Sequence, residues 1–296
     1  MSRTATLRVA ARLAQSTGAG PEFLDALDFC LAPLDRSVWP EVAWGFSRLT
    51  TTHFPVEFGF STHDDRLRVT LEVAGPEAPD DLRLDAALSL AAELGAPAPL
   101  AASLAAWRGL QSAAPLRWGC WLSLRQTDHG VGVKLYIEAP RGVAATAIES
   151  IPGSRLHMLG YDLNSGAAEH YFIWPRLGAL ECGARLRSLV AADAEALVDE
   201  LESVTRRPIA TALRLGRLGV SRIDGRAEIA LFVDSSAVRG GAAALRPRLA
   251  ANSYGAYAAL LGERPAGALP DHGVLSLIPR PDGMELRASI AADALQ

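Results

Sequence analysis

The sequence predicts an α/β fold: a ten-stranded antiparallel β-barrel, built from five hairpins and surrounded by helices. Segments with period-two alternation of apolar and polar residues come in pairs, and each pair is joined by a turn that carries Gly, Asp or Asn. Helical patterns separate the pairs. Ten consecutive antiparallel strands leave two exposed edges in an open sheet, and closure into a barrel removes both.

The five hairpins follow one another along the whole chain. They are expected at 56–60 with 67–73, 117–125 with 131–139, 156–163 with 169–174, 213–221 with 226–233, and 274–278 with 284–290. The turn residues between the partners tolerate the tight backbone of a hairpin. Because the hairpins are spread over the full length, residues 1–296 are expected to form one domain.

Helical periodicity fills most of the segments between the hairpins. The clearest helices are expected at 81–94 and 193–205, where Leu, Ala and Val recur on one face. Weaker patterns predict helices at 21–31, 100–110, 142–149 and 239–261. The repeated unit is therefore helix, hairpin, helix, a structural repeat without a sequence repeat. Disorder is expected only at the N-terminus.

Composition and charge exclude several classes of protein. The formal net charge is -4 and no block of Lys or Arg occurs, which argues against a nucleic-acid surface. No apolar run approaches the ~20 residues of a membrane span, and residues 1–10 lack the apolar core of a signal peptide. A cytoplasmic protein without a membrane partner is expected. Cys30, Cys120 and Cys182 are widely spaced, which predicts buried thiols rather than disulfides or a metal site.

The basic residues are almost all arginine. Of the 29 Lys and Arg residues, only Lys134 is lysine. An ammonium group is a compact point charge whereas guanidinium is a planar fork, so a site shaped for one rejects the other. Lys134 is therefore a candidate site residue, with chance survival under a coding bias as the alternative.

A barrel covered by helices reverses the usual meaning of strand alternation. The apolar faces then meet the helices, and the polar faces line the interior. The polar set includes Glu57, Arg66, Arg68, Trp121, Arg125, Lys134, Tyr136 and Arg287. In an open sheet the same faces would simply meet water.

A barrel of ten strands is too wide to be filled by side chains alone, so a cavity is expected. Its basic residues suit a compact polyanion such as diphosphate, held by charge-assisted hydrogen bonds from Arg66 or Arg68, Lys134 and Arg287. Its aromatic faces suit the shielding of a carbocation by Trp121, Tyr136, Tyr171 and Phe232. Glu57 suits a base that accepts the proton of an attacking nucleophile.

Several motifs resemble a known family. They are the Lys-x-Tyr of VGVKLYIEAP, the third hairpin LGYDLNSGAAEHYF and the first-hairpin pattern VEF…RLRVTLEV. Together with five helix-flanked hairpins, they resemble the ABBA-type barrel prenyltransferases, whose fold is the PT barrel of αββα units. The resemblance spans roughly residues 54–290, and the peptide-modifying enzymes of cyanobactin pathways are the most similar in length and layout.

The resemblance implies a function and a role for each site residue. A short isoprenyl group, dimethylallyl or geranyl, leaves its diphosphate as an allyl cation, and an electron-rich acceptor attacks it. Diphosphate binding is implied for Arg68, Lys134, Arg287 and, at the end of VSR, Arg222. The base is then Glu57, and the cation-shielding tyrosines are Tyr136 and Tyr171. No organic cofactor is expected, and the need for Mg²⁺ with the diphosphate stays open.

The acceptor is left with alternatives. A side chain of a peptide natural product is the leading hypothesis, and a tryptophan derivative or a phenol is the second. A third is a barrel that binds a hydrophobic or anionic ligand without chemistry. Inward Glu57 and Lys134 favour an enzyme, because a passive apolar carrier has no need of a buried base and cation.

Overall fold

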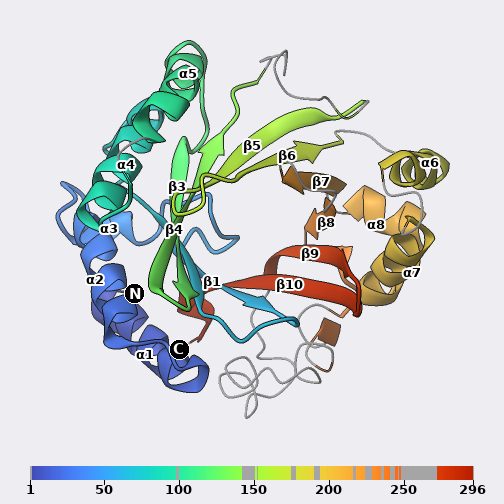
Figure 1. The fold of residues 1–296 in the computed structure, drawn as a ribbon, viewed down its shortest axis with the longest axis horizontal. Helices are drawn as coiled ribbons and strands as arrows, with labels where there is room; N and C mark the ends of the chain where they lie inside the picture. The colour runs from blue at the N-terminus through green and yellow to red at the C-terminus, as the bar shows by residue number, and fades with distance from the viewer. Residues whose placement is uncertain are drawn as a thin grey trace.

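The computed structural model shows a closed antiparallel barrel, which confirms the predicted fold (Figure 1). It describes residues 2–97, 100–141, 151, 153–174, 178–189, 194–215, 218–223, 229–234, 237–240, 244–245, 247 and 272–295. Each strand pairs with its neighbours in the sequence, and β1 pairs with β10 to close the barrel. The strands are β1 (Val56–Ser61), β2 (Arg68–Glu72), β3 (Cys120–Thr127), β4 (Gly130–Glu138), β5 (Arg155–Asp162), β6 (Ala168–Ile173), β7 (Leu218–Ile223), β8 (Ile229–Asp234), β9 (His272–Arg280) and β10 (Gly283–Ala291).

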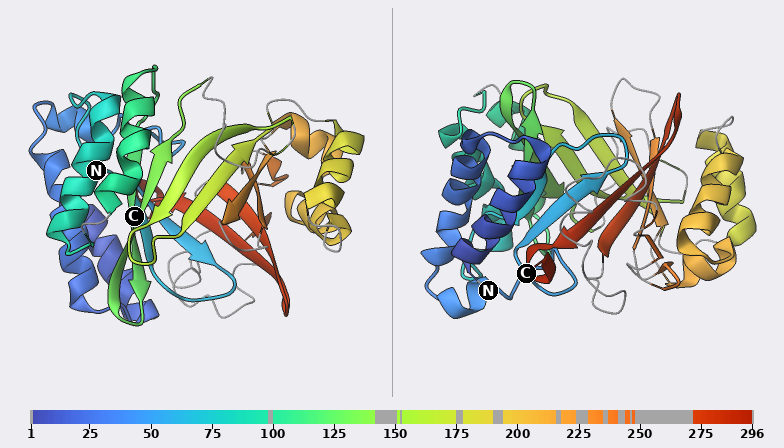
Figure 2. Two further views of the ribbon diagram at one scale, coloured as in Figure 1. Left: turned by 45° about the horizontal axis from the view of Figure 1, so that its top comes forward. Right: turned by 90° about the horizontal axis from the view of Figure 1, so that it is seen from below.

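The helices stand outside the barrel in two groups, which Figure 2 shows on opposite sides of the strands. One group contains α1 (Arg3–Thr17), α2 (Pro21–Asp35), α3 (Pro40–Ala43), α4 (Arg83–Glu93) and α5 (Leu100–Ser112). The other contains α6 (Ala179–Leu189), α7 (Ala194–Thr205) and α8 (Ile209–Leu215). Two short 3₁₀ turns, η1 (Asp80–Leu82) and η4 (Ala292–Leu295), precede α4 and follow β10. Among the described residues, none of these helices has the length and hydropathy needed to span a bilayer.

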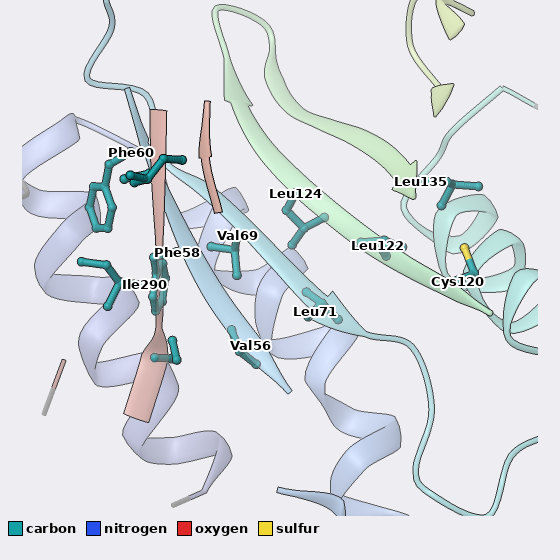
Figure 3. Close-up of a cluster of buried hydrophobic side chains, with 14 of the residues drawn as sticks. Val56, Phe58, Phe60, Val69, Leu71, Cys120, Leu122, Leu124, Leu135 and Ile290 are labelled. Atoms are coloured by element: carbon teal, nitrogen blue, oxygen red, sulfur yellow. The ribbon is translucent and has the colours of Figure 1, made fainter. Parts of the chain in front are cut away.

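The hydrophobic core lies between the outer face of the barrel and the helices. Figure 3 shows strand side chains that point toward the helices, among them Val56, Phe58, Leu71 and Leu122. Each of these is fully buried, which contributes about 1.5–3 kcal/mol per side chain. The alternate residues of the same strands face the lumen, as predicted for a barrel whose outer face is covered by helices.

Two predictions about the elements are wrong. The N-terminus is not disordered: α1 packs on α2 and buries Val9, Ala10 and Leu13 on one face. The fourth hairpin starts later than expected, because residues 213–215 end helix α8 and β7 begins only at Leu218. Helix α6 has no counterpart among the predicted helices.

Other sequence predictions are confirmed or lie outside the described residues. Cys30, Cys120 and Cys182 are free and buried, as expected. The helix expected at 142–149 lies outside the described part of the chain, as does most of the one expected at 239–261.

Candidate active site

The barrel contains a cavity of about 680 Å³ that polar and aromatic side chains line. At one end it is lined by Arg48 and Thr51, which precede β1, and by Val274 at the start of β9. These three residues are exposed, so the cavity reaches the surface there. A volume of this size accommodates a small-molecule ligand.

Most of the predicted site residues line this one cavity. They are Glu57, Arg68, Trp121, Tyr136, Tyr171, Phe232 and Arg287. They come from β1, β2, β3, β4, β6, β8 and β10, so only the closure of the barrel brings them together.

Two arginines expected in the cavity lie elsewhere. Arg66 precedes β2 and is exposed, where it forms a 2.9 Å salt bridge with Asp128 in the turn between β3 and β4. Arg222 follows Ser221, whose hydroxyl points inward to Glu169. Strand alternation therefore places Arg222 on the outer face, and neither arginine lines the cavity.

Lys134 faces the inside of the barrel, as expected, but it is not among the residues that line the cavity. Its ammonium donates to the carboxylate of Glu169 and lies 3.5 Å from the hydroxyl of Tyr171. Both members of this ion pair are buried. A Cβ at residue 160, on β5 opposite Tyr136, would lie 2.5 Å from the Lys134 Cε, so Gly160 makes room for the pair.

The Lys134–Glu169 pair is well satisfied within the protein. The hydroxyl of Ser221 donates to the second oxygen of Glu169 at 2.6 Å. Burial raises the pKa of Glu169, but Lys134, Ser221 and Tyr171 outweigh it and hold the pKa at about 2. The carboxylate is therefore ionised at neutral pH.

Three arginines form a cluster at the cavity wall: Arg68 on β2, Arg125 on β3 and Arg287 on β10. Arg68 and Arg125 are direct partners in the strand register. Burial lowers the pKa of Arg68, and the positive charges of Arg287 and Arg125 lower it further, whereas Asp64 opposes them. The sequence places Arg125 inside the barrel, but its part in this cluster was missed.

Carboxylates hold two of these arginines in place. Arg68 forms a 2.5 Å ion pair with Asp64, and the Arg287 Nε donates to Glu285 at 2.6 Å. Burial raises the pKa of Glu285, but Arg287, Ser61 and Arg280 outweigh it and bring the pKa to about 2.

Some N–H groups of the arginine cluster have no hydrogen-bond acceptor among the described residues. Arg125 donates from Nη2 to the Tyr136 hydroxyl at 3.0 Å. Among the described residues, the Arg68 Nη1 and the Arg125 Nε are buried and have no hydrogen-bond partner. An unpaired buried donor costs roughly 1–3 kcal/mol, so an anion that accepts these N–H groups would be stabilised here.

Aromatic side chains form another part of the cavity wall. Trp121 stacks on Trp118 with ring centroids 3.8 Å apart, and its indole N–H donates to Glu72 at 3.0 Å. The Tyr136 and Tyr171 rings meet edge to face at 6.0 Å, and Phe232 lies 5.9 Å from Tyr171. Such faces stabilise a cation held between them.

Glu57 lines the same cavity at a different level. Arg68 pairs with Gly59, two residues farther along β1, which is a step of about 7 Å. Burial raises the pKa of Glu57 to about 7, and a hydrogen bond from Ser289 opposes this rise. A carboxyl group with a pKa near neutrality is suited to accept a proton in a reaction.

Within the described parts of the chain, no group of three or more His, Cys, Asp or Glu side chains is arranged to hold a metal ion.

The chain matches no protein-family model and no curated protein sequence. Its structure is similar to 5-dimethylallyl tryptophan synthase from Streptomyces coelicolor in complex with DMASPP and Trp, with a TM-score of 0.71 and 19% identity over 99% of this chain and 95% of that chain. It is also similar to 6-dimethylallyltryptophan synthase from Micromonospora olivasterospora, with a TM-score of 0.70 and 18% identity over 100% and 99%. The similarity to AnaPT from Neosartorya fischeri has a TM-score of 0.63 and 15% identity over 95% and 90%. At these identities the likeness shows the fold, the ABBA-type barrel.

Proposed function

We propose that the protein transfers a dimethylallyl group from its diphosphate to a small electron-rich aromatic acceptor such as tryptophan or another indole. The observation that carries the proposal is the shared cavity. An arginine cluster with open donors, a set of aromatic faces and the carboxyl group of Glu57 all line it. The resemblance in fold to two dimethylallyltryptophan synthases supports the same chemistry.

The diphosphate of the donor would lie on Arg68, Arg125 and Arg287. Planar guanidinium groups match phosphate oxygens two at a time, and the unpaired N–H groups of Arg68 and Arg125 supply donors without disrupting the protein. Lys134 would add little net positive charge at the donor site, because Glu169 already binds its ammonium and balances its charge.

The reaction would proceed in two balanced steps. The C–O bond between the allylic carbon and the diphosphate breaks, and its electron pair leaves with the diphosphate, where the arginines stabilise the growing charge. The allyl cation is shielded by Trp121, Tyr136 and Tyr171. An aromatic ring carbon then forms a C–C bond to it, and Glu57 accepts the proton that this carbon loses.

The volume and the lining of the cavity support a small acceptor. At about 680 Å³ it has a volume typical of small-ligand sites, and the donor takes part of this space. Arg48, His157 and Asp234 line it as well and offer polar groups of both signs to an amino acid. A peptide side chain is the second candidate, because the exposed lining residues Arg48, Thr51 and Val274 leave an entrance to the cavity.

A direct assay tests the proposal. The protein is incubated with dimethylallyl or geranyl diphosphate and a panel of tryptophan, indoles, phenols and aromatic peptides, with Mg²⁺ or with EDTA. We expect a gain of one dimethylallyl group on an indole, detected by mass spectrometry, together with release of diphosphate. A mass gain only on peptides would favour the second candidate, and no gain on any acceptor would overturn the proposed activity.

The Glu57→Gln variant tests the assignment of the base. Proton transfer to a positioned base contributes about 10²–10⁴-fold, so we expect a loss of turnover in this range. The affinity for dimethylallyl diphosphate should stay within about twofold, because the arginine cluster is unchanged. A loss confined to donor affinity would contradict the assignment.

A further inference from the structure

Strands β9 and β10 contain an irregularity next to Glu57. Ala288 pairs with Leu275, but Ile290 pairs with His272. Two residues of β9, Gly273 and Val274, therefore lie opposite the single residue Ser289. Such a β-bulge bends the strand and redirects the side chains beside it, and bulges are frequent next to active sites.

The bulge brings three groups together. The hydroxyl of Ser289 donates a hydrogen bond to the carboxylate of Glu57. A Cβ at residue 273 would lie 2.8 Å from the Ser289 Oγ and 3.4 Å from the Glu57 Oε2. Any other residue at position 273 would push on this hydrogen bond, so Gly273 keeps the space that the contact requires.

We propose that Ser289 and Gly273 are positioning residues, which hold the Glu57 carboxylate toward the cavity as an ionised base. The inference rests on the proposed function for its catalytic meaning. The bulge directs the Ser289 hydroxyl toward Glu57. The hydroxyl donates to one lone pair of the carboxylate, and the remaining lone pairs can accept the proton of the acceptor.

Several charged side chains line the same cavity, but Ser289 is the described side chain that acts on the Glu57 carboxyl group. The described titratable and charged side chains that line the same cavity are Arg48, Arg68, Arg125, Tyr136, His157, Tyr171, Asp234 and Arg287. Thr70, the β2 partner of Glu57 in the register, carries no charge. Among the described residues, the pKa of Glu57 is raised by burial and lowered by Ser289.

The sign of the expected effect follows from the hydrogen bond. A hydroxyl that donates to the ionised form of a carboxyl group stabilises that form and lowers the pKa. Ser289→Ala should therefore raise the pKa of Glu57 and move the acid limb of the turnover profile upward by about one pH unit. Turnover well above this limb should fall several-fold, because the ionised carboxylate is no longer held toward the cavity, and the KM for the donor should not change.

Three further variants separate positioning from a structural role. Ser289→Thr keeps the hydroxyl and should restore the wild-type acid limb. Ser276→Ala removes another serine hydroxyl of the same cavity, on β9 opposite Arg287, and should leave the pKa of Glu57 unshifted. Gly273→Ala should shift the limb in the same direction as Ser289→Ala.

A measurement that needs no activity completes the test. Carbon-13 NMR of the glutamate carboxyl groups, assigned by difference from Glu57→Gln, gives the pKa of Glu57 in each variant. A raised pKa in Ser289→Ala, with wild-type values in Ser276→Ala and Ser289→Thr, supports the inference even if no acceptor is prenylated. An unshifted pKa in Ser289→Ala, or an equal shift in Ser276→Ala, overturns it even if transfer is observed.

Discussion

Two groups of cations lie inside the barrel, and they differ in how far the protein satisfies their hydrogen-bond donors. Lys134 has its charge balanced by Glu169 and lies near the Tyr136 and Tyr171 rings, so its contacts are made within the protein. The arginine cluster instead keeps buried N–H groups of Arg68 and Arg125 without acceptors in the described structure. Unpaired donors therefore indicate a ligand site better than the identity of the cation does.

The physical reason is a difference in free energy on binding. A buried donor without a partner costs roughly 1–3 kcal/mol, and a bound anion recovers this cost. An ion pair that is already hydrogen-bonded has no such cost to recover, and it must be broken before the lysine can reach a ligand. The arginine cluster should therefore dominate binding of the diphosphate.

The largest expected effect comes from the arginine cluster. Arg125→Met should weaken binding of inorganic pyrophosphate and of dimethylallyl diphosphate by about 100-fold, because a desolvated charge with an open donor is lost. Isothermal titration calorimetry measures both affinities. Arg66→Met is the matched control, since Arg66 is exposed and paired with Asp128, and it should bind as the wild type does. Equal losses in the two variants would remove the cluster from the donor site.

A smaller effect in the opposite direction is expected from Glu169. Glu169→Gln removes a negative charge beside the donor site and frees Lys134, so pyrophosphate should bind about tenfold more tightly. Without ligand the variant should unfold at a lower temperature, because the buried ammonium loses its carboxylate. Weaker binding in this variant would show that Glu169 supports the donor site rather than opposing it.

The fold was predictable from the sequence because each hairpin is a local structure. Alternation and turn residues at 56–73 or 274–290 identify two strands without knowledge of the rest of the chain. The inward direction of Glu57, Arg68 and Tyr136 follows from the same alternation once the barrel is assumed. Helix α1 was missed although Val9, Ala10 and Leu13, which form its buried face, recur at helical spacing.

The partners of the site residues were not predictable in the same way. The Lys134–Glu169 contact joins β4 to β6 across Gly160, and it depends on the register of two strand pairs that the sequence does not specify. Arg66 and Arg68 have the same parity in the chain, so alternation alone assigns both to the lumen. Only the start of β2 at Arg68 separates them.

The pH dependence of stability further tests the description of the lysine pair. Glu169 has a folded pKa of about 2, below the unfolded value of about 4.3, so its contribution is present above pH ~4.3 and lost as the pH falls toward 2. Between about pH 6 and pH 3, the Tm of the wild type should fall by roughly 5 °C more than that of Glu169→Gln. Glu285 titrates in the same range in both proteins, so the difference isolates Glu169. If the Tm of the two proteins falls equally between these pH values, the Lys134–Glu169 pair does not stabilise the fold.

The smallest effect on donor binding is expected when both members of the lysine pair are removed together. Lys134→Met combined with Glu169→Gln leaves the net charge of the lumen unchanged and leaves the open donors of Arg68 and Arg125 in place. Pyrophosphate affinity should then stay within about threefold of the wild type. The charges of Lys134 and Glu169 cancel in the wild type, so removing both changes the interaction with the ligand little. Calorimetry on Lys134→Met, Glu169→Gln and the double variant forms a double-mutant cycle. The cycle separates the effect of the Lys134 charge from direct contact between Lys134 and the ligand. A loss in the double variant as large as that of Arg125→Met would mean that the lysine leaves Glu169 and binds the diphosphate itself.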